Sequence, residues 1–250
     1  PVKLKAYRAL AAGRSRPGLV YIHGGGWCLG SVDSAESDAI CAYLAKAADV
    51  VVISVEYRLA PEHKFPAGFD DCRTALTWVA ANADLLGIDP DRLAGGGESA
   101  GGTLSAAVAL WARDEGGPKI ALQLLEAPAL DLTLSSPSIH EFDAEFPAVG
   151  QMAEELPGKY LDSDSDRANP YVSPLLAGEL SSLPRAVILA CEVDPLRDDA
   201  ARYAERLAQA GVPVQFKVYP GLLHGCWTLT LLLDQARAWR DHCVEALRTL

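Results

Sequence analysis

The chain has 250 residues, of which 50% are hydrophobic and 22% are charged, and its formal net charge at pH 7 is −11. This composition is typical of a folded globular protein and argues against intrinsic disorder. The excess of acidic residues argues against nucleic acid and anionic membranes as partners, because both bind clusters of Lys and Arg. No apolar run is as long as a membrane span, and we read no signal peptide in the sequence.

The six cysteines are scattered along the sequence, mostly in apolar surroundings, and none of them forms a CxxC pair. In a chain of this size such cysteines are typical of reduced, buried thiols. The histidines and cysteines also lack the spacing of metal ligands. We therefore expect a cytoplasmic protein that uses neither a metal ion nor another cofactor.

Strand-like and helix-like segments alternate along the sequence. The strand-like segments are apolar or alternate apolar with polar residues, at 2–7, 18–22, 50–55, before 95–97, and at 120–125, 186–191 and 214–219. Helical spacing of apolar residues occurs at 40–47, 69–79, 100–112, 198–210 and from about 228 onward. Asp33 and Glu36 have capping-box spacing ahead of the first of these helices. This order predicts an α/β fold in a single domain, 1–250, with helices on both faces of a mostly parallel, twisted sheet.

The region 128–183 interrupts the alternation of strands and helices. It is irregular and rich in Ser, Pro and Asp. Long irregular segments inside a compact domain are uncommon and are often functional. We therefore expect an insertion that lies over one edge of the sheet, and we expect His140, within it, to lie at the surface.

The stretch GGGESAGG, at 95–102, surrounds a single serine with glycines. A flexible linker does not fit, because an apolar strand enters the glycines and a regular helix leaves them. A phosphate-binding loop has the pattern GxxxxGK[ST], and no lysine follows here. The remaining interpretation is the GxSxG nucleophile elbow, a strained strand-to-helix turn that exposes a serine, here Ser99.

A serine hydroxyl is a poor nucleophile unless a base removes its proton, and that base is oriented by a carboxylate. On an elbow fold these residues follow in the order Ser, then Asp or Glu, then His. His224 lies in a loop after a strand and is preferred as the base over His242, which sits in an amphipathic helical segment. Asp194 directly follows a strand and is preferred as the acid over Asp198, whose place suits the start of a helix.

Acyl transfer also needs fixed N–H donors for the oxyanion of its tetrahedral intermediate. HGGGW, at 23–27, follows an early strand, where the HGGG-type element of esterases and lipases belongs. Its glycines let the backbone amides turn toward a pocket without a Cβ in the way. Ala100 supplies another amide directly after the serine. His23 is interpreted as a residue that holds the loop by a hydrogen bond.

With these motifs in view, the chain resembles the hormone-sensitive-lipase-like family of carboxylesterases, a branch of the α/β-hydrolase fold. HGGGW, YRLAPEHKFP, GESAGG, DPLRDD and YPGLLHG look like that family's signatures, in its order, and span about 18–225. The resemblance implies a catalytic triad of Ser99, Asp194 and His224. It also implies that the site needs no cofactor, and that homodimers are common among relatives.

The same resemblance implies roles for the surrounding loops. Oxyanion amides are implied for Gly25, Gly26 and Ala100, with Gly24 shaping the turn, and a role in pinning the YRLAPE loop is implied for Arg58 and Glu62. Family members usually carry an N-terminal helical segment in a cap over the site, and few residues precede the strand into HGGGW here. We therefore expect a reduced cap built from the insertion, with a helix near 152–160.

The expected function is that of a serine carboxylesterase that hydrolyses short- to medium-chain acyl esters through an acyl-enzyme. Trp27 and Leu29 are candidates for the acyl pocket, with ordinary core as the alternative. The rate is expected to fall at low pH as His224 is protonated, with a midpoint of about 6 to 7. An amidase, arylformamidase or lactonase uses the same triad and stays open as an alternative. A non-catalytic receptor on this fold is disfavoured, because His224 is present.

Overall fold

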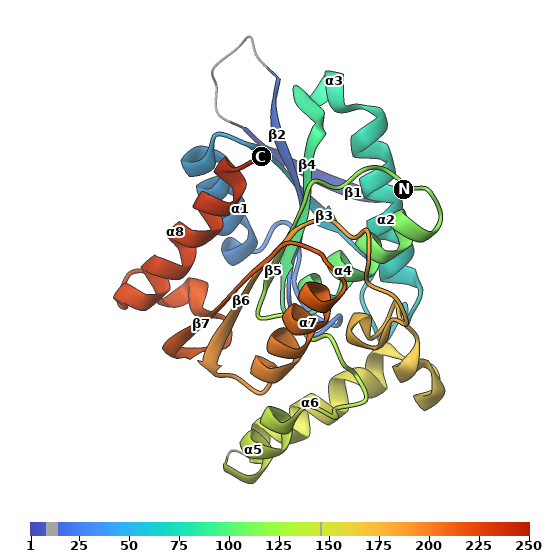
Figure 1. The fold of residues 1–250 in the computed structure, drawn as a ribbon, viewed down its shortest axis with the longest axis vertical. Coiled ribbons are helices and arrows are strands. Elements are labelled where there is room, and N and C mark those ends of the chain that lie inside the picture. The colour runs from blue at the N-terminus through green and yellow to red at the C-terminus, as the bar shows by residue number, and fades with distance from the viewer. Residues whose placement is uncertain (9–14, 146) are drawn as a thin grey trace.

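A seven-stranded sheet forms the centre of the computed structural model, which describes residues 1–8, 15–145 and 147–250 (Figure 1). In spatial order its strands are β1 (Lys3–Tyr7), β3 (Val51–Glu56), β2 (Arg16–Ile22), β4 (Ile88–Glu98), β5 (Leu122–Glu126), β6 (Ala186–Val193) and β7 (Val214–Leu223). Among the described strands, β1 alone pairs antiparallel. The predicted α/β fold with a mostly parallel sheet is confirmed.

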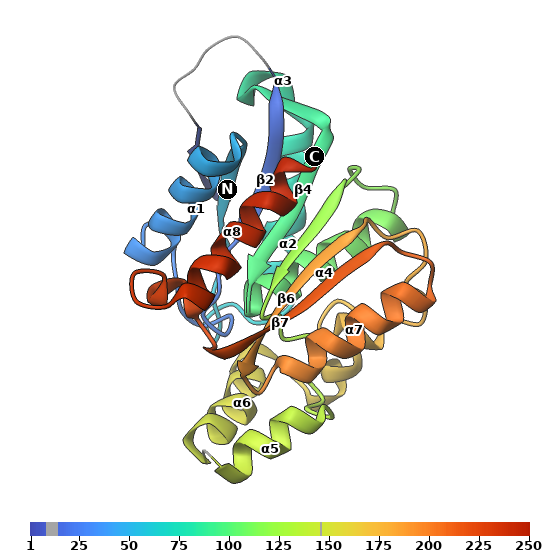
Figure 2. The same ribbon diagram turned by 60° about the vertical axis from the view of Figure 1, so that its left-hand side comes forward.

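Helices cover both faces of the sheet (Figure 2). On one face, α1 and α8 bury Leu44 and Trp239 against the strands, whereas α2, α4 and α7 bury Leu76, Leu104 and Leu207 on the other face. The bounds of the helices are α1 (Ala35–Ala48), α2 (Ala67–Ala81), α3 (Ala83–Leu86), α4 (Ala100–Asp114), α7 (Arg197–Gln209) and α8 (Asp234–Arg248). Because both faces are covered, β3 and most of β2 and β6 are apolar and buried, which explains the continuous apolar runs of these segments in the sequence.

Between β5 and β6 the chain leaves the sheet and builds α5 (Pro137–Glu145), α6 (Pro147–Tyr160) and the short 3₁₀ helices η1 (Asp164–Ala168) and η2 (Pro174–Leu176). α5 and α6 lie together beyond the carboxyl ends of the parallel strands (Figures 1 and 2). The helix expected near 152–160 is the second half of α6. This insertion therefore stands over the edge of the sheet at which loops from several strands converge.

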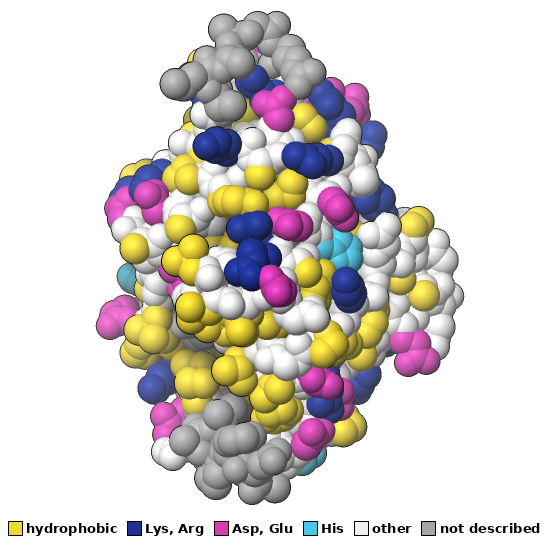
Figure 3. Space-filling model, turned by 90° about the vertical axis from the view of Figure 1, so that its left-hand side faces the viewer, with side chains coloured by type: hydrophobic (Ala, Val, Ile, Leu, Met, Phe, Trp, Pro, Cys, Tyr) yellow, Lys and Arg dark blue, Asp and Glu magenta, His cyan; other side chains and the backbone are white. Residues whose placement is uncertain are grey.

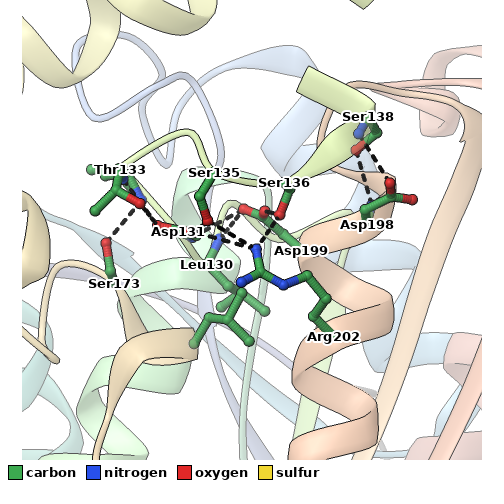
Figure 4. Close-up of polar contacts among 12 residues, drawn as sticks. Leu130, Asp131, Thr133, Ser135, Ser136, Ser138, Ser173, Asp198, Asp199 and Arg202 are labelled. Atoms are coloured by element: carbon green, nitrogen blue, oxygen red, sulfur yellow. Dashed lines mark hydrogen bonds and ion pairs between the residues drawn. The ribbon is translucent and has the colours of Figure 1, made fainter. Parts of the chain in front are cut away.

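Acidic side chains at the start of α7 hold the root of this insertion, by which we mean its first residues, 130–138 (Figure 4). The buried carboxylate of Asp199 accepts hydrogen bonds from the amides of Leu130, at 2.9 Å, and Asp131, at 3.0 Å. Asp198 accepts a hydrogen bond from the amide of Ser138 at 2.9 Å. Two acids of the DPLRDD motif thus satisfy backbone donors that the insertion leaves open.

Arg202, one turn further along α7, completes this polar cluster. Its Nη1 donates to the hydroxyl of Ser136 at 2.8 Å and lies 3.3 Å from a carboxylate oxygen of Asp131. Burial raises the pKa of Asp199 to about 7, although the hydrogen bonds it accepts oppose that rise. The cluster therefore joins the start of α7 to the insertion through hydrogen bonds of the buried Asp131, Ser136 and Asp199, and Arg202 closes it from the partly exposed side.

Two boundaries differ from the sequence expectation. The N-cap of α1 is Ser34, whose Oγ accepts a hydrogen bond from the amide of Ser37 at 3.2 Å, so the predicted capping box of Asp33 and Glu36 is wrong. The last helix begins at Asp234 rather than near 228, because Cys226–Leu229 forms a separate 3₁₀ turn, η3. Ser34 caps the helix as well as Asp33 would, so residue spacing alone does not identify which of them is the N-cap.

The surface around α1 and α8 mixes apolar side chains with charges of both signs (Figure 3). The loop before α8 exposes Leu231 and Leu232. Among the helices that the structure describes, none is both long enough and apolar enough to cross a bilayer. The cytoplasmic location, the absence of nucleic-acid binding and the single domain stay predictions from the sequence.

Candidate active site

Ser99 occupies the sharp turn between β4 and α4. Its φ of 56° and ψ of −120° place a residue with a side chain in a costly region of backbone space. Flanking glycines allow the turn, because a Cβ on Gly97 or on Gly101 would overlap the carbonyl oxygen of Ile22 on β2. The turn places the Ser99 side chain at the carboxyl end of the central strand.

The structure brings three of the predicted residues into one chain of hydrogen bonds. Nε2 of His224, in the loop after β7, lies 2.9 Å from Oγ of Ser99. Nδ1 of His224 lies 2.7 Å from Oδ2 of Asp194, which directly follows β6. Asp194 is buried, and its Oδ1 accepts a hydrogen bond from the amide of Leu196 at 2.9 Å. The fixed carboxylate holds the imidazole with Nε2 facing the serine.

Opposing effects set the pKa of His224. Burial disfavours the imidazolium, whereas the negative charge and the hydrogen bond of Asp194 favour it, with a smaller contribution from the charge of Glu98. The attractive effects win and raise the pKa from 6.5 to about 9. This is above the midpoint of about 6 to 7 that an unperturbed histidine predicts.

The HGGGW loop lies beside this chain of hydrogen bonds. Gly25 and Gly26 have positive φ angles of 116° and 58°. A Cβ on Gly25 would overlap the carbonyl group of Leu29, so the tight winding of the loop requires glycine there. Gly24 and both of these glycines line the same cavity as Ser99. Ala100, as the first residue of α4, has an amide without a partner inside the helix.

His23 is buried at the base of this loop. Its ring stacks on Tyr57, with centroids 4.4 Å apart, and its Nδ1 lies 2.8 Å from the carbonyl oxygen of Gly24. Burial lowers the pKa of His23, which favours the neutral ring. Tyr57 also donates its hydroxyl to the carbonyl oxygen of His23 at 3.0 Å. These contacts fit the interpretation of His23 as a residue that holds the loop.

A cavity of about 680 Å³ opens above Ser99 and His224. Its apolar wall comes mainly from the insertion and consists of Leu132, Leu134, Ile139, Phe142, Met152 and Leu156. β2, the start of α1 and the end of β4 supply a second part of the wall, which is mostly polar and consists of Tyr21, Ser34, Glu36, Ser37, Ile40 and Glu98. A cavity of this size and mixed character is typical of a small-molecule site.

Trp27 and Leu29 both line this cavity, but in different ways. Trp27 is buried and stacks on Tyr160 of α6, with ring centroids 4.7 Å apart, so it also belongs to the core between loop and insertion. Leu29 is 68% exposed and stands at the mouth of the cavity. The two interpretations offered for Trp27, pocket and core, therefore both apply.

A model of the α/β-hydrolase fold matches residues 19–228 of this chain. The chain belongs to the α/β-hydrolase family. Carboxylesterase NlhH of Mycobacterium tuberculosis (strain CDC 1551 / Oshkosh) is 44% identical over 238 residues, which cover 93% of this chain and 73% of that protein. Arylacetamide deacetylase of Bos taurus is 34% identical over an alignment of 282 positions, gaps included, that covers 88% of this chain and 70% of that protein.

Solved structures agree with this assignment. A hyperthermophilic esterase from the archaeon Pyrobaculum calidifontis superposes on this α/β hydrolase with a TM-score of 0.94 at 38% identity. The match covers 100% of this chain and 81% of that one. The resemblance to hormone-sensitive-lipase-like carboxylesterases, predicted from the motifs, is confirmed by the family model and by these relatives.

The residues that the sequence disfavoured for the triad lie outside the site of this α/β hydrolase. His242, on α8, bonds through Nδ1 to the hydroxyl of Tyr219 at 3.0 Å, and His140 is exposed on α5. Asp198 belongs to the root of the insertion. Glu62 is exposed and has no bonding partner among the residues that the structure describes, so its implied role in pinning the YRLAPE loop is wrong.

Arg58 pins that loop through a different acid. Its Nε and Nη2 reach the two carboxylate oxygens of Asp71 on α2, at 2.8 and 3.0 Å. Asp71 also accepts a hydrogen bond from the amide of Arg58 at 2.9 Å. An acid on the following helix, thirteen positions further along, satisfies the guanidinium, and no local motif pointed to it.

Sequence reasoning missed the polar wall and one contact of the insertion. Leu156 of α6 packs against the HGGGW loop, so closely that a Cβ on Gly26 would lie 2.6 Å from its Cδ1. Tyr21 reads as an ordinary strand residue, and Glu98 occupies the variable position of GxSxG. The one sequence signal that could have indicated part of this wall is the position of Glu98, directly before Ser99.

Proposed function

We propose that this protein is a serine carboxylesterase that hydrolyses short- to medium-chain acyl esters through an acyl-enzyme intermediate. The observation that carries the proposal is the chain of hydrogen bonds from Ser99 through His224 to Asp194, set in a cavity that the oxyanion glycines line. The predicted class of enzyme, a carboxylic ester hydrolase, is confirmed by the relatives. The catalytic roles and the chain-length preference are part of the proposal.

In the first half of the reaction, Oγ of Ser99 attacks the ester carbonyl while Nε2 of His224 takes its proton. The carbonyl oxygen becomes an oxyanion and accepts hydrogen bonds from the amides of Gly25, Gly26 and Ala100. Asp194 stabilises the imidazolium without taking the proton itself. Collapse of the intermediate breaks the bond to the alcohol, which leaves with the proton from His224.

In the second half, water replaces the alcohol. His224, now neutral, removes a proton from the water as its oxygen attacks the acyl-enzyme carbonyl. The same amides bind the second oxyanion. When this intermediate collapses, His224 returns the proton to Oγ of Ser99 and the carboxylic acid is released.

The shape of the cavity supports the preference for short and medium chains. Leu156 of the apolar wall lies against Gly26, and Trp27, which also lines the cavity, is fixed by its stack on the buried Tyr160. An acyl chain buried along this wall gains about 0.8 kcal/mol per methylene group. A chain that extends beyond these residues adds no further gain, because its end stays in water.

Amide cleavage is the alternative, because the same groups perform it. One relative, the bovine arylacetamide deacetylase, is named for an amide substrate. A matched pair of an aryl acetate and the corresponding aryl acetamide separates the two functions. A larger kcat/KM on the acetamide would replace the esterase proposal by an amidase. A homodimer and a cytoplasmic location remain proposals on the sequence argument alone.

The direct test is hydrolysis of p-nitrophenyl esters from acetate to palmitate by the protein and by Ser99→Ala. We expect a maximum at short or medium chains, and loss of turnover by several powers of ten in the variant. Ser165→Ala is the matched control, since Ser165 lies on η1 and does not line the cavity. Equal turnover in Ser99→Ala would refute the proposal.

A further inference from the structure

Glu126, the last residue of β5, is bonded to the segments that carry two members of the proposed triad. Its backbone carbonyl oxygen accepts a hydrogen bond from the amide of Ser99 at 2.8 Å. Its carboxylate accepts one from the indole of Trp227, in η3, at 2.6 Å. The turn η3 begins two residues after His224. One residue therefore contacts both the turn of the nucleophile and the turn that follows the base.

The segment around His224 has few strong contacts of its own. The imidazole is 37% exposed, so packing encloses it only in part. In η3 the amide of Thr228 lies 3.4 Å from the carbonyl oxygen of Gly225, and the amide of Thr230 lies 3.3 Å from that of Trp227. Both distances exceed the usual range of about 2.7–3.2 Å. The short indole bond to Glu126 is therefore what ties this turn to the sheet.

The carboxylate of Glu126 is itself held in place. The side chain is wholly buried, and the Oε2 atom that binds Trp227 also accepts hydrogen bonds from two groups on α8. These are the indole of Trp239, at 2.9 Å, and the thiol of Cys243, at 3.3 Å. Three donors on one oxygen leave the carboxylate little freedom to move, so it can fix the position of Trp227.

A carboxyl group is costly at this place in the core. Glu98, which is also buried, lies opposite Glu126 on the neighbouring strand β4. Burial, and the charge of Glu126, raise the pKa of Glu98 to about 8. Burial also raises the pKa of Glu126, although the hydrogen bonds from both indoles oppose that rise. Buried charged groups contribute little to stability compared with apolar side chains of similar volume, so stability alone does not account for Glu126.

We infer that Glu126 is a positioning residue for ester hydrolysis, and that it holds the His224 loop in register with Ser99 through the indole of Trp227. This inference rests on the proposed serine esterase function. Neither Glu126 nor Trp227 lines the cavity. Their loss should therefore lower kcat, which depends on the approach of His224 to Ser99, and leave KM unchanged.

Two matched variants test the inference. Trp227→Phe and Trp239→Phe each remove a buried indole donor from the same oxygen of Glu126, but only Trp227 lies in the turn that follows His224. We measure kcat and KM on p-nitrophenyl butyrate. Complete titration with diethyl p-nitrophenyl phosphate, which releases one p-nitrophenol for each reactive serine, counts the active sites. This count separates a loss of folded protein from a loss of turnover.

We expect kcat per active site to fall about ten- to a hundredfold in Trp227→Phe, because a small displacement of a catalytic group costs that much. In Trp239→Phe, kcat per active site should stay near that of the unaltered protein. A purely structural role for Glu126 would lower the number of active sites in both variants and leave kcat per site unchanged.

Substitutions of Glu126 itself provide a second comparison. Glu126→Gln keeps an oxygen that can accept the indole bond, whereas Glu126→Met has a similar size and no such acceptor. We expect Glu126→Gln to retain most of kcat and Glu126→Met to lose as much as Trp227→Phe. Equal losses in both would overturn the inference, because the hydrogen-bond acceptor would then not be what positions the loop.

Equal kcat per active site in Trp227→Phe and Trp239→Phe would also overturn the inference, while ester hydrolysis itself persists. A rise in KM with kcat unchanged in Trp227→Phe would do the same, because the indole would then act on substrate binding. Hydrolysis by the unaltered protein no faster than by Ser99→Ala would instead refute the proposed function, and the inference with it.

Discussion

Tyr160, the last residue of α6, stacks on Trp27 of the HGGGW loop with ring centroids 4.7 Å apart and planes inclined by 12°. Phe65 meets the same tyrosine edge-on at 6.0 Å. The insertion therefore contacts the HGGGW loop through a packed aromatic pair, and also through Leu156 against Gly26. Through these two contacts α6 supports the loop that carries Gly25 and Gly26.

Removal of this stack should weaken both stability and turnover. Tyr160→Ala leaves a large cavity in a well-packed core, and we expect a loss of about 3–5 kcal/mol in the free energy of unfolding. We also expect a lower kcat, because the loop that carries Gly25 and Gly26 loses its support. Urea unfolding and ester hydrolysis, measured on the same preparations, check both effects.

Tyr160→Phe serves as the control for that variant. The hydroxyl of Tyr160 is buried, and the described residues offer it no partner, so its loss should cost little or even stabilise the fold. A drop in stability as large as that of Tyr160→Ala would contradict the account, because the ring and its stack remain.

The acid of the proposed triad can be separated from its acidic neighbours. Asp194→Asn should lower kcat about 10⁴-fold, because the imidazole loses the partner that fixes its tautomer and stabilises its charge. Asp198→Asn should keep most of the activity, because Asp198 bonds to Ser138 at the root of the insertion and not to His224. If the two variants lose activity equally, the assignment of the acid is wrong.

The pH dependence of kcat/KM follows from the pKa of His224. The base must be neutral to accept a proton, so activity should rise with pH as the imidazolium loses its proton. Since Asp194 raises the pKa of His224 to about 9, we expect the midpoint of this rise to lie above 6.5. In Asp194→Asn the midpoint of the residual activity should move to lower pH. A midpoint that stays in place would show that another group limits the rate.

Local motifs were enough to predict the groups that carry the proposed chemistry. Ser99, Asp194 and His224 each follow a strand directly, and strands of a parallel sheet end at one edge. Each residue was therefore placed near the others by the order of elements alone. The need for glycine in HGGGW and GESAGG could also be predicted, because it depends on local backbone geometry.

Side chains whose partners are distant in the sequence were not predictable. Arg58 bonds to Asp71 rather than to Glu62, because α2 brings that acid under the loop. Asp199 is buried only because the insertion folds back over the start of α7. Tyr21 and Glu98 become parts of one wall only once β2, β4 and α1 have packed. Such contacts depend on tertiary packing, and no periodic pattern in the sequence indicates which distant residues will pack together.

The glycines on both sides of Ser99 provide the strictest test of the elbow. Gly97→Ala and Gly101→Ala each place a Cβ against the carbonyl oxygen of Ile22, where the neighbour is backbone and cannot turn aside. We expect each variant to lose about 3 kcal/mol or more in the free energy of unfolding, or to fail to accumulate as folded protein.

Gly178→Ala is the matched control for the elbow variants, since a Cβ there meets nothing within 4 Å. Its free energy of unfolding should change by less than about 1 kcal/mol. Thermal unfolding of the three variants separates the effects. If Gly97→Ala unfolds at the same temperature as Gly178→Ala, the close approach of β2 to the elbow is not what requires glycine, and the argument for the turn fails.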